Sequence, residues 1–147
     1  MKVLLEKIFQ KIKKTPGDIV GYEDLYYMCL EALNEDKELA VEYLQMLSKC
    51  IEDIIPGVVE VEFLQKLFDL HKKVLLAAAP YHFESYILYI EWNREPDKKF
   101  YPPRRTVLSQ VVDALQELAD DKLDLLAVSL SPGAGKSTLA IFFLTWW

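Results

Sequence analysis

One eight-residue segment near the end of the chain constrains its fold more than any other feature. Residues 131–138 have the sequence Ser-Pro-Gly-Ala-Gly-Lys-Ser-Thr, a P-loop pattern typical of a loop that wraps phosphate groups at the positive end of a helix. The loop needs glycines because its backbone adopts dihedral angles that other residues avoid. An apolar run precedes it, so we predict a buried strand over Leu125–Leu130 and a helix from Gly135 to about Trp147.

The residue types in this loop define a phosphate site. Gly133 and Gly135 would let consecutive backbone N–H groups converge on phosphates. Lys136 would pair with the outer phosphates, and Ser137 would be a ligand of Mg²⁺ with the Thr138 hydroxyl close by. The predicted nucleotide-binding residues of the loop are Ser131, Pro132, Gly133, Ala134, Gly135, Lys136, Ser137 and Thr138. The alternative is a glycine-rich turn that precedes Lys-Ser by chance.

Four helices are predicted in residues 1–79, because apolar residues recur there at helical spacing between short breaks. The predicted helices cover residues 1–14, 18–33, 35–54 and 58–79. The first should place its lysines mostly opposite an apolar side made of Val3, Leu4, Ile8, Phe9 and Ile12. We therefore expect a small helical bundle. No residue pattern returns at a fixed period, which argues against a helical repeat.

Residues 80–147 have a different organisation. An aromatic helix is predicted from Tyr81 to about Trp92, with Glu84 and Glu91 on a solvated face, and a second helix from about Arg104 to Asp120. The connector between them is rich in proline and locally basic. The predicted fold class is mainly α: an N-terminal helical bundle, then the first strand, phosphate loop and helix of an α/β P-loop NTPase domain.

Composition limits the possible functions. The 147 residues have a net charge of −6, which argues against a surface that grips nucleic acid over its whole extent, so any DNA contact must be local. Cys29 and Cys50 lie in apolar helical stretches, as free thiols do in a reducing compartment. No apolar run is long enough for a signal peptide or a membrane span. We expect a soluble, unexported protein with no membrane partner.

A resemblance extends over residues 79–147, just under half of the chain. The segments that carry it are Phe100-Tyr101-Pro102-Pro103-Arg104-Arg105, Leu108-Ser109-Gln110 and residues 129–138. Together they resemble the start of the ATPase domain of the large terminase subunit of tailed phages. Members of that family commonly lack the first glycine of the standard loop, and in this chain Leu130 occupies that position. Many members also have an arginine early in the loop, which this chain lacks.

The resemblance implies ATP and Mg²⁺ as cofactors and an ATP-driven motor that packages double-stranded DNA in the bacterial host cytoplasm. For the full-length protein it also implies a C-terminal nuclease domain, with a portal and a small terminase subunit as partners. The family contacts adenine with an upstream segment. Carried over, Tyr101 would stack on the base, Arg104 or Arg105 would reach base or phosphate, and Gln110 would read the base edge. Alternatively, Tyr101-Pro102-Pro103 is a stiff connector and the arginines are solvated.

The sequence contains no acidic pair suited to ATP hydrolysis after the loop, and its last residues are almost wholly apolar. We therefore expect a truncated chain that self-associates, with Phe142, Phe143, Trp146 and Trp147 exposed or folded back on residues 1–79. Two alternatives stay open. One is a helicase or another DNA-dependent P-loop ATPase, and the other is a helical interaction module with a nonfunctional P-loop remnant. A downstream acidic pair and a carboxylate-rich nuclease domain would favour the terminase.

Overall fold

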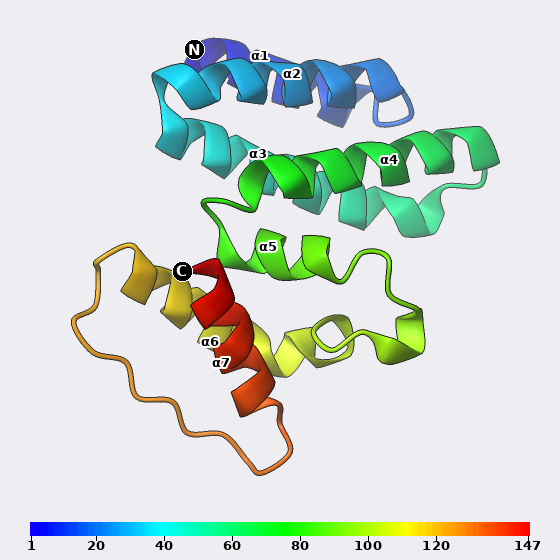
Figure 1. Cartoon of the computed structure of the whole chain (residues 1–147). Coiled ribbons are helices and arrows are strands. Elements are labelled where there is room, and N and C mark those ends of the chain that lie inside the picture. The colour runs from blue at the N-terminus through cyan, green and yellow to red at the C-terminus, as the bar shows by residue number, and fades with distance from the viewer. The chain divides into compact units, whose positions relative to one another are not determined.

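Seven α-helices and no strand make up the regular structure (Figure 1). The computed structural model describes residues 1–147. Its chain divides into two compact units, Met1–Ala78 and Ala79–Trp147. The boundary drawn from the sequence lies one residue further on, between residues 79 and 80. No helix has the length and apolar character needed to span a membrane.

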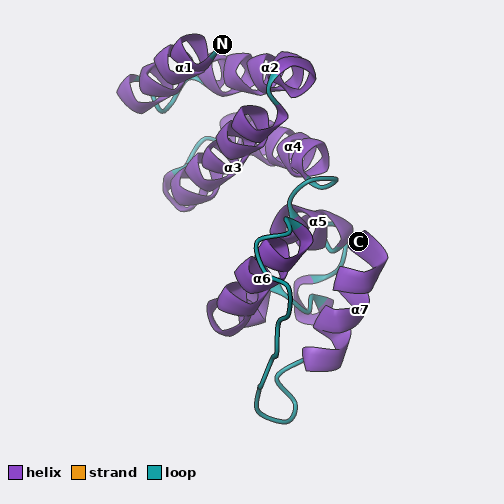
Figure 2. Ribbon diagram, turned by 90° about the vertical axis from the view of Figure 1, so that its left-hand side faces the viewer, coloured by secondary structure: helices purple, strands orange, loops and turns teal.

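The first unit contains four helices joined by short connections: α1 (Lys2–Lys14), α2 (Ile19–Glu35), α3 (Lys37–Ile54) and α4 (Val61–Ala78). The side chain of Asp18 accepts a hydrogen bond from the Val20 N–H and caps α2, and Asp36 caps α3 through the Leu39 N–H. Consecutive helices lie side by side (Figures 1 and 2). The four helices predicted in this region are confirmed, with ends that differ by up to three residues.

The core of this bundle is apolar, and each helix contributes one face to it. Its α1 members are Leu5, Phe9 and Ile12, whereas Val3 and Leu4 are exposed. The prediction for the apolar side of this helix is therefore right for Phe9 and Ile12 and wrong for Val3 and Leu4. The side of α1 that faces the core is the one that carries Leu5, Phe9 and Ile12, and the opposite side carries lysines.

The second unit contains α5 (Phe83–Ile90), α6 (Arg105–Ala119) and α7 (Lys136–Trp146), with single 3-10 turns at Pro96–Lys98 and Pro102–Arg104. Its core members are Phe83, Ile87, Tyr101, Leu108, Val112, Leu139 and Phe143. The helices predicted in this region are confirmed. A long connection without regular structure joins α6 to α7 (Figures 1 and 2).

The strand predicted over Leu125–Leu130 is wrong, and so is the fold class that depended on it. These residues form no ladder, and Leu125 is mostly exposed. A strand satisfies its backbone N–H and C=O groups by pairing with a neighbour, and no other segment of this chain forms a strand. The apolar run therefore lies in a segment without regular secondary structure.

The apolar helix α7 is covered on one side only. Phe143 is buried with its ring centroid 5.3 Å from that of Phe83, and the indole N–H of Trp146 donates to the Ala79 carbonyl oxygen at 2.8 Å. Ile141, Leu144 and Trp147 are exposed. Four aromatic residues are expected to be exposed or folded back on residues 1–79. In the structure Trp147 is exposed, Phe142 and Trp146 are half-buried, and Phe143 is buried in the core of its own unit.

Candidate phosphate-binding loop

Two glycines in the segment before α7 have left-handed backbone dihedral angles. Gly133 has φ of 81° and Gly135 has φ of 95°, in the left-handed region that favours glycine. The Ala134 N–H donates to the Ser131 carbonyl oxygen at 3.1 Å and closes a turn over residues 131–134. The helix begins at Lys136, directly after Gly135. The helix predicted after the glycines is therefore confirmed, whereas the strand and the P-loop fold element predicted with it are absent.

The first turn of α7 presents its polar groups to solvent. Lys136, Ser137 and Thr138 are all exposed, and no carboxylate contacts Lys136. No side chain caps the helix at Gly135. The first N–H groups of a helix have no acceptor within it, and they form the positive end of the helix dipole. An anion at this position would meet free N–H groups and one flexible ammonium.

Phe100 packs directly against the loop. A Cβ atom at Gly135 would overlap the Phe100 ring, so the close approach of ring and backbone requires glycine at this position. The ring also contacts Phe142 of α7 edge to face, with centroids 5.8 Å apart. Phe100 was not among the predicted site residues, because a single aromatic residue in a connector gives no signal of what it contacts.

Arg104 lies over Phe100 at the edge of the loop. Its guanidinium carbon is 4.8 Å from the ring centroid, and its Nη1 donates to the Phe100 carbonyl oxygen at 2.9 Å. Its Cδ atom is 3.7 Å from the position that a Cβ of Gly135 would take. The side chain is otherwise exposed. Of the four predicted site residues upstream of the loop, only Arg104 lies beside it.

Glu91 holds Phe100 in place from the end of α5. Its side chain is only 1% exposed. The carboxylate accepts hydrogen bonds from the Phe100 N–H at 2.6 Å and the Tyr101 N–H at 2.9 Å, and Arg94 Nη1 lies 3.3 Å away. The prediction of a solvated face for Glu91 is wrong. A buried carboxylate requires such partners, because an unpaired buried charge is strongly unfavourable.

Tyr101 is part of the core of this unit. Its ring is fully buried, and its hydroxyl donates to Glu84 Oε2 at 2.6 Å. Burial raises the Tyr101 pKa far above its ordinary value, and the hydrogen bond to Glu84 adds to the rise. The ring has no exposed face with which to stack on a base. In this structure Tyr101 therefore anchors the connector.

Arg105 and Gln110 have different surroundings from Arg104. Arg105 Nη2 donates to Glu84 Oε1 at 2.7 Å, so this guanidinium is committed to an ion pair. The prediction of a solvated face for Glu84 is wrong as well, because its carboxylate accepts from both Tyr101 and Arg105 and is mostly covered. Gln110 is exposed on α6 and makes no hydrogen bond to the loop. Its base-reading role stays a prediction.

The chain by itself offers no group of three or more His, Cys, Asp or Glu side chains that could hold a metal ion. Mg²⁺ keeps several waters and binds phosphate oxygens alongside few protein ligands. The exposed Ser137 hydroxyl fits that limited role, as one protein ligand to an ion that arrives with a polyphosphate.

No protein-family model, curated protein or solved structure matches this chain.

Proposed function

We propose that residues 131–138 bind the phosphates of a nucleoside triphosphate, ATP with Mg²⁺. The observation that carries the proposal is the pair of left-handed glycines, Gly133 and Gly135, directly before an uncapped helix whose first residue is an unpaired lysine. Free N–H groups, the helix dipole and Lys136 all favour a multiply charged anion. The proposal stands on this loop and helix terminus, without a sheet.

Within this site, Lys136 would pair with the outer phosphates and Ser137 would be a ligand of Mg²⁺. Mg²⁺ would shield the charge of the phosphates. Arg104 would add a second positive charge, since its Cδ atom passes beside Gly135 and its guanidinium lies over the Phe100 ring that packs there. The N–H groups of the loop would bind the phosphate oxygens that the cations leave free.

The resemblance to terminase large subunits supports a wider proposal. In that setting the loop is the ATP-binding part of a motor that packages double-stranded DNA, with a portal and a small terminase subunit as partners. A full-length protein carrying Lys136→Ala should then fail to package DNA into procapsids, whereas one carrying Lys122→Ala should package normally. Normal packaging by the Lys136 variant would contradict the motor assignment.

Nucleotide binding is tested directly on this chain by calorimetric titration with ATP, ADP and AMP in the presence of Mg²⁺. We expect affinity to fall in that order. Lys136→Ala removes a charged hydrogen-bond donor worth about 1.5–3 kcal/mol, so ATP affinity should drop roughly 10- to 100-fold. Lys122→Ala is the matched control, because Lys122 is an exposed lysine of the same unit, outside residues 131–138. Equal affinities for the two variants, or no ATP binding by the unmodified chain, would reject the proposal.

A further inference from the structure

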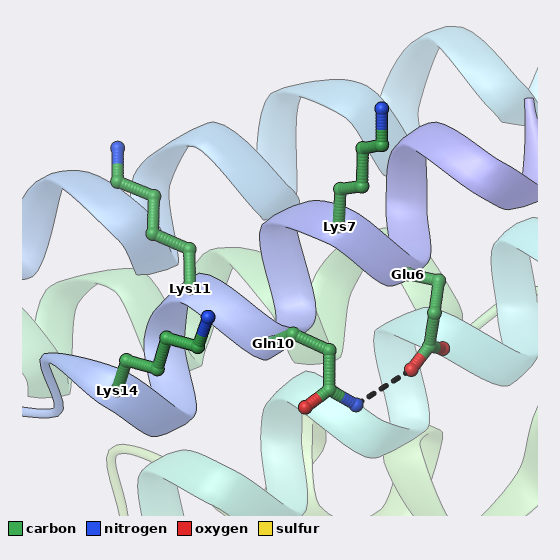
Figure 3. A pocket seen from close by; sticks show the side chains of 5 residues that line it. All are labelled: Glu6, Lys7, Gln10, Lys11 and Lys14. Carbon is green, nitrogen blue, oxygen red and sulfur yellow. Dashed lines mark hydrogen bonds between the residues drawn. The ribbon is translucent and has the colours of Figure 1, made fainter.

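The outer face of α1 concentrates positive charge in an acidic chain. The helix contains five lysines and one glutamate, a net charge of +4, whereas the whole chain has a net charge of −6. Lys7, Lys11 and Lys14 follow one another at spacings of four and three residues, which places them on one side of a helix. Figure 3 shows the three side chains extending from the same helix, around a hollow of about 350 Å³.

These lysines are poorly neutralised. Lys7 and Lys14 contact no carboxylate. Lys11 Nζ is 4.0 Å from Asp24 Oδ2, and both side chains are at least half exposed, so this ion pair contributes little stabilisation. Glu6 is the only acidic residue of the helix, and its two oxygens accept hydrogen bonds from Gln10 and from the Tyr43 hydroxyl, each at 2.7 Å. The chain has more carboxylates than cations, yet two of these three lysines have no ion pair and the third has only a long, exposed one.

From this arrangement we propose that Lys7, Lys11 and Lys14 form a docking surface for the phosphate backbone of nucleic acid. The three residues span about 10 Å along the helix axis at 1.5 Å per residue. Nucleic acid presents phosphates densely over such a length, about one charge per 1.7 Å of duplex axis. Lysine recognises phosphate as a point charge and needs no fixed geometry, which suits sequence-independent contact.

Other anionic partners fit this face less well. A helix that lies on a membrane inserts its apolar face, but that face of α1 is buried in the bundle through Leu5, Phe9 and Ile12. The centres of protein interfaces are enriched in aromatic residues and arginine and depleted in lysine. The stripe consists of lysines with Gln10 and Glu6 beside it. A phosphate backbone requires only charge, which is what this face supplies.

The docking surface is independent of nucleotide binding by residues 131–138, so the two proposals fail separately. The test uses the full chain, without ATP, and a fluorescein-labelled 30-base-pair duplex of arbitrary sequence read by anisotropy at 20 mM salt. Single-stranded DNA of the same length and phosphatidylserine vesicles are the other probes. Three neutralised phosphates predict a slope of about −2.7 for log affinity against log salt on the duplex, or roughly 40-fold weaker binding at 200 mM than at 50 mM.

The decisive variant is Lys7→Gln/Lys11→Gln/Lys14→Gln. We expect duplex affinity to fall at least about tenfold and the salt slope to flatten by two to three. The control variant Lys49→Gln/Lys66→Gln/Lys73→Gln removes three exposed lysines of α3 and α4 with the same change in net charge. It should stay within about twofold of the unmodified chain. A Lys136→Ala variant should keep its duplex affinity.

A second measurement needs no substitution. Acetylation of the unmodified chain, read by mass spectrometry, should show Lys7, Lys11 and Lys14 protected by the duplex and Lys49 unprotected. The proposal is overturned by any of three results: no nucleic acid bound at 20 mM salt, equal losses in the two triple variants, or binding to vesicles without binding to nucleic acid. Single-stranded DNA bound as tightly as the duplex would support the proposal and place the recognition in the backbone of one strand.

Discussion

Substituting Gly135 with alanine tests the contact that joins the connector to the glycine loop. The new Cβ would overlap the Phe100 ring, and alanine would have to adopt φ of 95°. The strained backbone costs about 1–2 kcal/mol, and forcing extra atoms into a packed contact costs about 1–3 kcal/mol more. Gly133→Ala is the matched control, because Gly133 has φ of 81° and open space around its Cβ position. Only the strain should apply there.

All three tryptophans, Trp92, Trp146 and Trp147, lie in the second unit. Urea unfolding followed by tryptophan fluorescence therefore reports the stability of that unit. With a slope of about 1 kcal/mol per molar urea for a small unit, the midpoint of Gly135→Ala should lie about 1–3 M below that of Gly133→Ala. Adding Phe100→Ala should remove most of this difference, because the overlap disappears. Equal midpoints for the two glycine variants would refute the proposed contact.

Three further predictions concern titratable or reactive groups. The chain should bind ATP without turnover above background in a phosphate-release assay, because residues 136–147 contain no Asp or Glu that could orient Mg²⁺ or activate water. Hydrolysis that Lys136→Ala abolishes would contradict this. Burial disfavours the charged form of Glu84, but hydrogen bonds from Tyr101 and Arg105 outweigh it and lower its pKa below the ordinary 4.5. Glu84 therefore stabilises the second unit above pH 4.5, and the unfolding free energy should fall as the pH drops through the lowered pKa; Glu84→Gln should flatten that dependence. Burial raises the pKa of Cys29 to about 12, so a disulfide reagent should label Cys50 first and Cys29 only after unfolding, and rapid labelling of both would argue against the packing.

The helices could be predicted from the sequence because their signals are local. Apolar spacing predicted every helix, and the capping side chain of Asp18 lies only two residues from the N–H group that it accepts from. The unusual backbone at Gly133 and Gly135 is equally local, since glycine tolerates the left-handed dihedral angles that both residues adopt. These features depend on residues within a few positions of one another, so one sequence is enough to find them.

The strand and the environment of the acidic residues could not be predicted in this way. An apolar run over Leu125–Leu130 has the pattern of a buried strand, but a strand forms only if a second segment pairs with it. Glu84 and Glu91 have the pattern of a solvated face, yet the connector folds over them and supplies N–H and guanidinium donors. Partners that lie 9 to 21 residues away leave no periodic signal.

The buried carboxylate of Glu91 also bears on the order in which the second unit folds. Its hydrogen bonds connect Glu91 to Phe100 and Tyr101, which are nine and ten residues further along the chain. A loop of that size closes within about 10–100 ns at small entropic cost. The end of α5 and the Phe100 segment can therefore take shape as a local nucleus before α7 arrives from more than thirty residues away. On the ribosome, at about 5–20 residues per second, Phe100 would be in place seconds before Gly135 is added. Mutational analysis of refolding rates would then give Glu91 a high φ-value and Phe143 a low one, and the reverse ranking would assign the nucleus to α7.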